Sequence, residues 1–98
     1  MPTYVTLVNF TDAGRESVDT LPEDIERMKQ LKRSLGGEPK GFFFTLGQYD
    51  LVAVSELPDD ESVAQIELTA AMEGDVDLEI LRAFSLNEVR DILGEVPS

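Results

Sequence analysis

The chain has 98 residues, which suits one domain spanning residues 1–98 and leaves no room for a second. Eight Lys and Arg residues against 20 Asp and Glu residues give a net charge of −12, so nucleic-acid backbones and anionic lipid surfaces would be repelled. The sequence contains no Cys, His or Trp. These absences exclude disulfides, thiolate nucleophiles and Cys-type zinc sites, and they remove the commonest general base and metal ligand.

The chain opens directly into a β-like segment without a charged and then apolar leader. No apolar run approaches the roughly 18 residues that a membrane span requires. We therefore expect a cytoplasmic protein that has neither nucleic acid nor membrane as a partner. Because the usual ligands and any Gly-rich phosphate loop are missing, we also expect no metal, haem or nucleotide cofactor.

The first part of the chain is expected to form a strand followed by a helix. Thr3–Phe10 (TYVTLVNF) is β-branched and aromatic and predicts a strand. Thr11–Gly14 is a turn that can open a short helical piece through Val18. Thr20–Glu23 has the pattern of a capping box and predicts the start of a helix. Gly36-Gly37 ends this helix, because only Gly enters the left-handed cap without steric cost. The apolar residues of the helix recur on one face: Ile25, Met28, Leu31 and Leu35.

The middle of the chain predicts two strands and a second long helix. Gly41–Leu46 (GFFFTL) and Leu51–Leu57 (LVAVSEL) read as strands, and Gly47–Asp50 between them suits a tight hairpin. Pro58–Glu61 begins a helix, with acidic residues where the positive end of the helix dipole favours them. Gly74 ends that helix.

The last part predicts a fourth strand and a short helix. Asp75–Phe84 begins as an alternation of polar and apolar residues, and Ser85–Glu88 is a second capping box. The helix that follows is expected to turn Val89, Ile92 and Leu93 inward. The order β-α-β-β-α-β followed by α predicts an α+β, ferredoxin-like fold with an extra C-terminal helix. Its antiparallel sheet has four strands, with the helices on one face.

The first three strands are apolar on both sides, although the helices can cover only one face of the sheet. In the first strand, Val5 and Leu7 point to one side and Tyr4, Val8 and Phe10 to the other. In the second, Phe42, Phe44 and Leu46 oppose Phe43 and Thr45. In the third, Leu51, Ala53 and Leu57 oppose Val52 and Val54. Such a face must be covered. We expect a second copy to cover it, giving a dimeric α+β barrel, a homodimer or a higher homo-oligomer. The alternative is that the C-terminal helix folds over part of the bare face.

The hairpin Gly47-Gln48-Tyr49-Asp50 stands among features that together resemble one known family. These are a Leu35-Gly36-Gly37 helix end, an aromatic strand before the hairpin, Pro58–Glu61, and a closing Leu81–Ser85. Over nearly the whole chain they resemble the GYD-domain family, small bacterial and archaeal proteins of the dimeric α+β barrel superfamily. The resemblance implies the fold and oligomer formation, and it implies no activity. A looser resemblance links the hairpin to the effector-binding domains of Lrp/AsnC-type regulators, which bind small molecules at subunit interfaces.

Six residues are candidates for binding a small molecule in a cavity between paired sheets: Tyr4, Phe43, Thr45, Tyr49, Asp50 and Arg82. Arg82 lies in an otherwise apolar strand end and requires a partner, for which Asp50 and Glu79 are candidates; it could clamp a ligand carboxylate or form an ion pair. Tyr4, Tyr49 and Asp50 could form an acid–base cluster. The alternative is that Tyr49 packs at the dimer seam and Asp50 fixes the turn.

Two functions stay open at this point. The first is an oligomeric, non-enzymatic domain that binds a small molecule, or simply assembles, around the cavity between its sheets. The second is a cofactor-independent enzyme, similar to a monooxygenase or isomerase, that acts on a small hydrophobic substrate. The enzyme would need a carboxylate whose pKa is raised by burial, because the sequence has no His.

Overall fold

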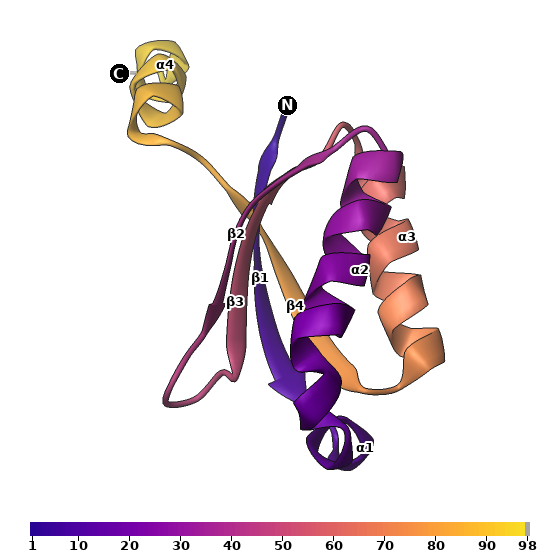
Figure 1. Cartoon of the computed structure of the whole chain (residues 1–98). Coiled ribbons are helices and arrows are strands. Elements are labelled where there is room, and N and C mark those ends of the chain that lie inside the picture. Colours follow the sequence, from indigo (N-terminus) through magenta and orange to yellow (C-terminus); the bar gives the residue numbers. More distant parts are fainter. Residues whose placement is uncertain (98) are drawn as a thin grey trace.

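The computed structural model describes residues 1–97 and has four strands and four α-helices in the expected order. They are β1 (Thr3–Phe10), α1 (Asp12–Glu16), a 3₁₀ turn η1 (Val18–Thr20), α2 (Leu21–Ser34), β2 (Glu38–Phe44), β3 (Leu51–Glu56), α3 (Asp60–Glu73), β4 (Val76–Ala83) and α4 (Leu86–Glu95). The strands form one antiparallel sheet in the order β2-β3-β1-β4. Helices α2 and α3 cover one face of it (Figure 1). The ferredoxin-like α+β fold with an extra C-terminal helix is therefore confirmed.

Capping residues explain where most of the helices begin and end. Asp59 accepts a hydrogen bond from the Ser62 N–H at 2.9 Å and starts α3, and Gly74 ends it in the left-handed conformation with φ of 76°. Ser85 and Glu88 form the expected capping box of α4. The box predicted at Thr20 is wrong: η1 runs directly into α2, and the Thr20 hydroxyl bonds to Ser17 O and Asp24 Oδ2 instead.

Strand β2, which lies at one edge of the sheet, differs from its predicted bounds. It begins at Glu38 rather than Gly41 and ends at Phe44 rather than Leu46. An edge strand tolerates Pro39, whose nitrogen has no hydrogen to donate, and the pairing with β3 shifts register between Pro39 and Gly41. The hairpin is accordingly longer than the predicted tight turn and is closed by the Thr45 N–H, which donates to Asp50 O at 2.9 Å.

The core lies between the sheet and helices α2 and α3. Alternate residues of β1 and β3 point into it, as the period of two requires. Its buried members are Tyr4, Thr6, Val8, Leu51, Ala53, Ser55, Leu57, Ser62, Ile66 and Ala70, together with Lys32 of α2. The charged Lys32 was not expected in this core.

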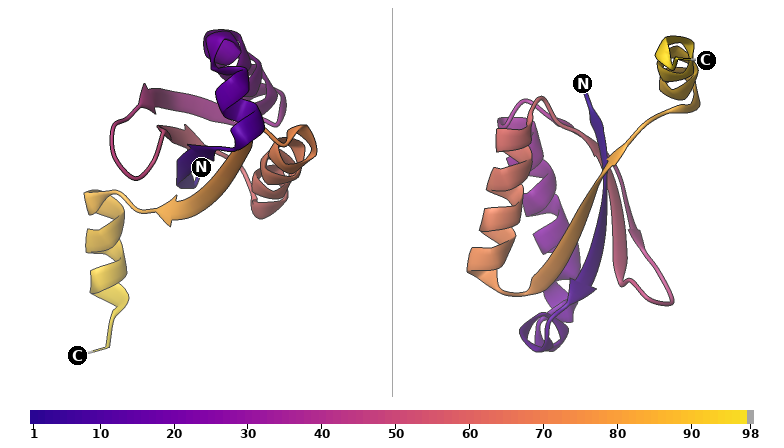
Figure 2. Two further views of the ribbon diagram at one scale, coloured as in Figure 1. Left: turned by 90° about the horizontal axis from the view of Figure 1, so that it is seen from below. Right: turned by 180° about the vertical axis from the view of Figure 1, so that it is seen from behind.

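The opposite face of the sheet is bare in a single chain. We call this side of the sheet the bare face. The antiparallel register places six large apolar side chains on it: Val5, Leu7, Phe43, Val52, Val54 and Leu81. Helix α4 extends from the end of β4 on this side of the sheet but stands away from it (Figure 2). Val89, Ile92 and Leu93 are exposed, so the expectations that they face inward and that this helix covers the bare face are both wrong for a single chain.

Candidate functional site

The six candidate residues occupy three separate places in the chain. Tyr4 and Arg82 are paired neighbours of β1 and β4 at one end of the sheet. Thr45 and Asp50 lie in the hairpin at the other end. Phe43 is on the bare face, and Tyr49 reaches that face from the hairpin. Tyr4, Tyr49 and Asp50 do not come together as an acid–base cluster within one chain.

Asp50 and Thr45 hold the hairpin closed and tie it to β1. The Asp50 carboxylate accepts a hydrogen bond from the Phe10 N–H at 2.8 Å, while its own N–H donates to Val8 O at 2.8 Å. The Thr45 hydroxyl donates to Tyr49 O at 2.6 Å. Gly47 has φ of 113°, a conformation that favours glycine. These contacts satisfy the hydrogen-bonding capacity of backbone groups in the hairpin and in β1. Asp50 therefore has a structural role.

Tyr49 connects the hairpin to the far side of the sheet. Its hydroxyl donates to Glu79 Oε2 at 3.2 Å, and this bond spans the intervening strand β1. The hydrogen bond to the Glu79 carboxylate, together with its negative charge, raises the pKa of Tyr49. Tyr49 is therefore a neutral hydrogen-bond donor near pH 7 and is not poised to act as a base.

Arg82 joins the sheet to the root of α4. Its guanidinium lies 4.3 Å from the Phe84 ring centre and 3.7 Å from Glu88 Oε2, and it also donates to Thr3 O and Ala83 O. The predicted partners Asp50 and Glu79 are wrong, because they bond to Phe10 and Tyr49. Glu88 has a lowered pKa, chiefly because its carboxylate accepts the Ser85 N–H and also because Arg82 is near.

Tyr4 is buried beside Arg82 and bonds to the start of α3. Its hydroxyl donates to Asp60 Oδ1 at 3.3 Å, and its ring centre is 5.9 Å from the Arg82 guanidinium carbon. Burial raises the pKa of Tyr4, and the Asp60 carboxylate adds to the effect. Tyr4 thus packs the core and donates one hydrogen bond.

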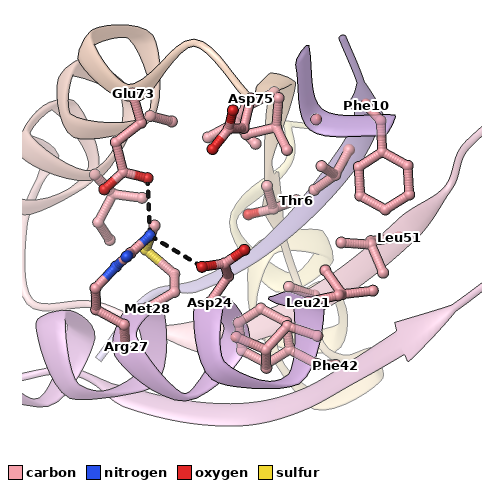
Figure 3. Close-up of a pocket in the computed structure, with 18 of the residues that line it drawn as sticks. Thr6, Phe10, Leu21, Asp24, Arg27, Met28, Phe42, Leu51, Glu73 and Asp75 are labelled. Carbon is pink, nitrogen blue, oxygen red and sulfur yellow. Dashed lines mark hydrogen bonds and ion pairs between the residues drawn. The ribbon is translucent and has the colours of Figure 1, made fainter. Parts of the chain in front are cut away.

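A cavity of about 100 Å³ lies on the helix side of the sheet, between α2, α3 and the strands. Figure 3 shows Arg27 between Asp24 and Glu73 at one side of it, at 3.5 Å and 3.2 Å from their carboxylate oxygens. Most of the remaining lining is apolar and includes Leu21, Met28, Phe42, Leu51, Ile66 and Ala70. This cavity is a different place from the sheet interface that the sequence suggested.

Lys32 is the lining residue that the sequence analysis missed. It is only 3% exposed, its ammonium donates to Ser55 Oγ at 2.7 Å, and it lies 4.5 Å from the centre of the Phe42 ring. Burial lowers its pKa from 10.5 to about 8. A signal was present: Lys32 follows Ile25 and Met28 at helical spacing, so it occupies a core-facing position despite its charge.

Residues 1–97 contain neither a cluster of metal-binding side chains nor a membrane-spanning helix. Within that range, no group of three or more acidic side chains is arranged to hold a metal ion. None of the helices described there has the length and apolar content needed to cross a membrane.

Comparison with known proteins gives three matches. The model of the GYD domain family matches residues 4–93. A protein of Thermus thermophilus named "Glutamine synthetase and cystathionine beta-lyase binding protein" is 34% identical over 90 residues, which cover 91% of this chain and 95% of that protein. A solved structure, "De novo designed protein Ferredog-Diesel", covers 84% of this chain and 85% of its own at 16% identity, with a TM-score of 0.49.

Proposed function

The chain belongs to the GYD domain family, and we propose that it is an assembly domain that binds metabolic enzymes. Two copies pair through their bare faces, and helix α4 of each copy enters an apolar groove on the partner enzyme. The observation that carries the proposal is α4 itself, which stands away from the sheet (Figure 1) and whose apolar residues are exposed.

Helix α4 has the properties of a docking element. It has ten residues, and isolated helices shorter than about 12 residues are marginal in water, so a helix of this length needs a surface to pack against. Its apolar residues gather on one side, at spacings of three and four: Leu86, Val89, Ile92 and Leu93. An amphipathic helix recognises a partner by placing such a side in an apolar groove.

The bare face supports pairing between copies. Its six apolar residues lie on neighbouring strands, and a contiguous apolar patch of this kind marks an interaction surface. Acidic residues on the same face, Glu56, Asp77 and Glu79, disfavour nucleic acid or an anionic membrane as its cover. A second sheet packed face to face would bury the patch.

The relative from Thermus thermophilus supports the choice of partner. It is named for binding glutamine synthetase and cystathionine beta-lyase, and its alignment with this chain extends almost to the ends of both. We therefore propose these two enzymes as partners of this chain. The alternative of a cofactor-independent enzyme is less favoured, since Tyr49 has a raised pKa and the Asp50 carboxylate already accepts the Phe10 N–H.

Partner binding can be tested with two variants of α4 that change the net charge equally. Leu93 is 63% exposed on the apolar side, whereas Glu95 lies on the polar side. Leu93→Lys should weaken binding to immobilised glutamine synthetase or cystathionine beta-lyase from the same organism by at least roughly tenfold, as expected when a charge replaces a buried apolar anchor. Glu95→Gln should bind like wild type. Equal binding by Leu93→Lys and wild type would exclude α4 as the docking element.

Pairing through the bare face has its own matched test. Phe43 is 58% exposed on the bare face, and Leu46 is 93% exposed in the hairpin, outside the paired strands. In sedimentation velocity, wild type and Leu46→Asp should be dimeric, and Phe43→Asp should be monomeric because it would place a charge inside the interface. A wild-type protein that is monomeric at micromolar concentration would contradict the pairing.

A further inference from the structure

We propose that the cavity between α2, α3 and the sheet binds a small molecule with a short apolar body and a single carboxylate, and that Lys32 binds the carboxylate. This site is separate from the bare face and from α4, and the inference does not depend on the proposed function.

Lys32 adds a buried positive charge to the lining of the cavity. Lys32 carries an ammonium group into an apolar core, where an isolated charge is strongly disfavoured unless it is paired. Its contacts are the neutral hydroxyl of Ser55 and the face of the Phe42 ring. Within residues 1–97 no carboxylate forms an ion pair with it. An ammonium has three donors, so a bound carboxylate would supply the missing negative charge and accept a further hydrogen bond.

The contrast with Arg27 strengthens this argument. Arg27 lines the same cavity but is neutralised by Asp24 and Glu73, as Figure 3 shows. The chain carries 20 acidic residues, so partners for a lysine are abundant on its surface. Lys29, one turn earlier on the same helix, has such a partner in Glu26 at 3.8 Å. Lys32 therefore stands out as a buried cation in the cavity lining that has no ion pair with an acid among the described residues.

The size and lining of the cavity define the rest of the ligand. A volume of about 100 Å³ is smaller than the roughly 150 Å³ of engineered apolar cavities that accept benzene. It therefore suits a branched body of about four carbon atoms beside the carboxylate. The body would contact the apolar side chains from both helices and the sheet, including Met28, Ile66 and Leu51. Isovalerate has this shape and charge and serves as the probe.

The experiment is a titration of the full-length protein followed by NMR of the cavity methyl groups. Isovalerate should shift the methyl signals of Met28, Ile66 and Ala70, while isovaleramide, which has the same shape without the charge, should bind at least about tenfold more weakly. Lys32→Met should abolish the isovalerate response, and Lys29→Met, the same change one turn earlier, should leave it intact. Because methionine is close to lysine in length and apolar, Lys32→Met should fold.

A second variant tests the cavity without touching the charge. Ala70→Leu places extra atoms from α3 into the space and should also remove the isovalerate response, although Lys32 is unchanged. Absence of a response in wild type up to about 50 mM would overturn the proposal, because a dissociation constant above that value is too weak for a specific site. Equal responses to isovalerate and isovaleramide, or equal responses in wild type and Lys32→Met, would overturn it as well.

Discussion

Lys32 and Arg82 show how the surroundings of a single side chain decide its role. Both are cations among apolar residues, and the sequence marked only Arg82 as unusual. The structure gives Arg82 an acidic neighbour, Glu88, and aromatic rings, whereas Lys32 is buried against Ser55 and Phe42. The charge of Lys32 gave no sign of its burial, because charge alone does not reveal which side of a helix meets the sheet. Only the helical period carries that information.

The pH dependence of stability should report the burial of Lys32. Burial lowers its pKa from 10.5 to about 8, so between these values the unfolded chain holds the proton that the folded chain has lost. The free energy of unfolding should therefore rise with pH, by roughly 2 kcal/mol from pH 7 to about pH 9.5. Tyr4 and Tyr49 have pKa values raised above 10.0 and lose their protons beyond this window.

Urea denaturation at several pH values measures this effect. The rise should disappear in Lys32→Met and persist in Lys29→Met, because Lys29 is paired with Glu26 at the surface. Curves for wild type and Lys32→Met that run parallel across the window would show that Lys32 is solvated in the folded protein.

Asp50 should contribute to stability through one hydrogen bond. In Asp50→Ala the Phe10 N–H loses its acceptor, and the hairpin loses a tie to the end of β1. We expect the free energy of unfolding to fall by about 1–3 kcal/mol, the usual cost of an unsatisfied, partly buried donor. Asp50→Asn keeps an acceptor oxygen and should recover most of this loss in urea denaturation. If alanine and asparagine both leave stability unchanged, the bond does not hold the hairpin.

At the level of elements, sequence patterns predicted where most helices and strands occur and failed where packing decides the outcome. Ser85 and Glu88 predicted the start of α4 correctly, since a capping box is a local interaction. They could not predict that the helix stands away from the sheet. An apolar side on a helix indicates that some surface packs against it, but it does not indicate whether that surface belongs to the same chain. The ends of β2 were misjudged for a similar reason, as being an edge strand is a property of the whole sheet.

The stability of α4 should depend on its own residues rather than on the sheet. Ser85→Ala removes the N-cap bond to the Glu88 N–H, which is worth about 1 kcal/mol and corresponds to roughly fivefold faster amide exchange. Gly94 has open space around it, so Gly94→Ala should slow exchange about threefold by favouring the helical backbone. Hydrogen exchange should show both changes in α4, with the amides of β1 and β3 unaffected. Equal changes in the sheet would mean that α4 folds as part of the core.

At the level of the whole molecule, the order of elements was sufficient to predict the ferredoxin-like fold, and the resemblance to the GYD-domain family is confirmed by the match over residues 4–93. The position of the candidate functional site was harder to predict from the sequence. Five of the six candidate residues were chosen for their closeness to the expected sheet interface or hairpin, and Lys32 lies on the other side of the sheet. A sequence shows that both faces are apolar, but it does not show on which side a cavity is left.

The net charge provides the last prediction, which concerns pairing of whole copies. Each chain carries −12, so two copies repel each other, and the proposed contact between them is made mainly by the apolar side chains of the bare face. Salt shortens the range of the repulsion, to about 10 Å at 0.1 M, and leaves apolar burial largely unaffected. The dissociation constant of the dimer should therefore fall, by on the order of tenfold between about 20 mM and 200 mM NaCl. Sedimentation equilibrium measures this directly. Phe43→Asp should stay monomeric throughout the range, whereas weakening of the wild-type dimer by salt would mean that ion pairs, and not the bare faces, hold the copies together.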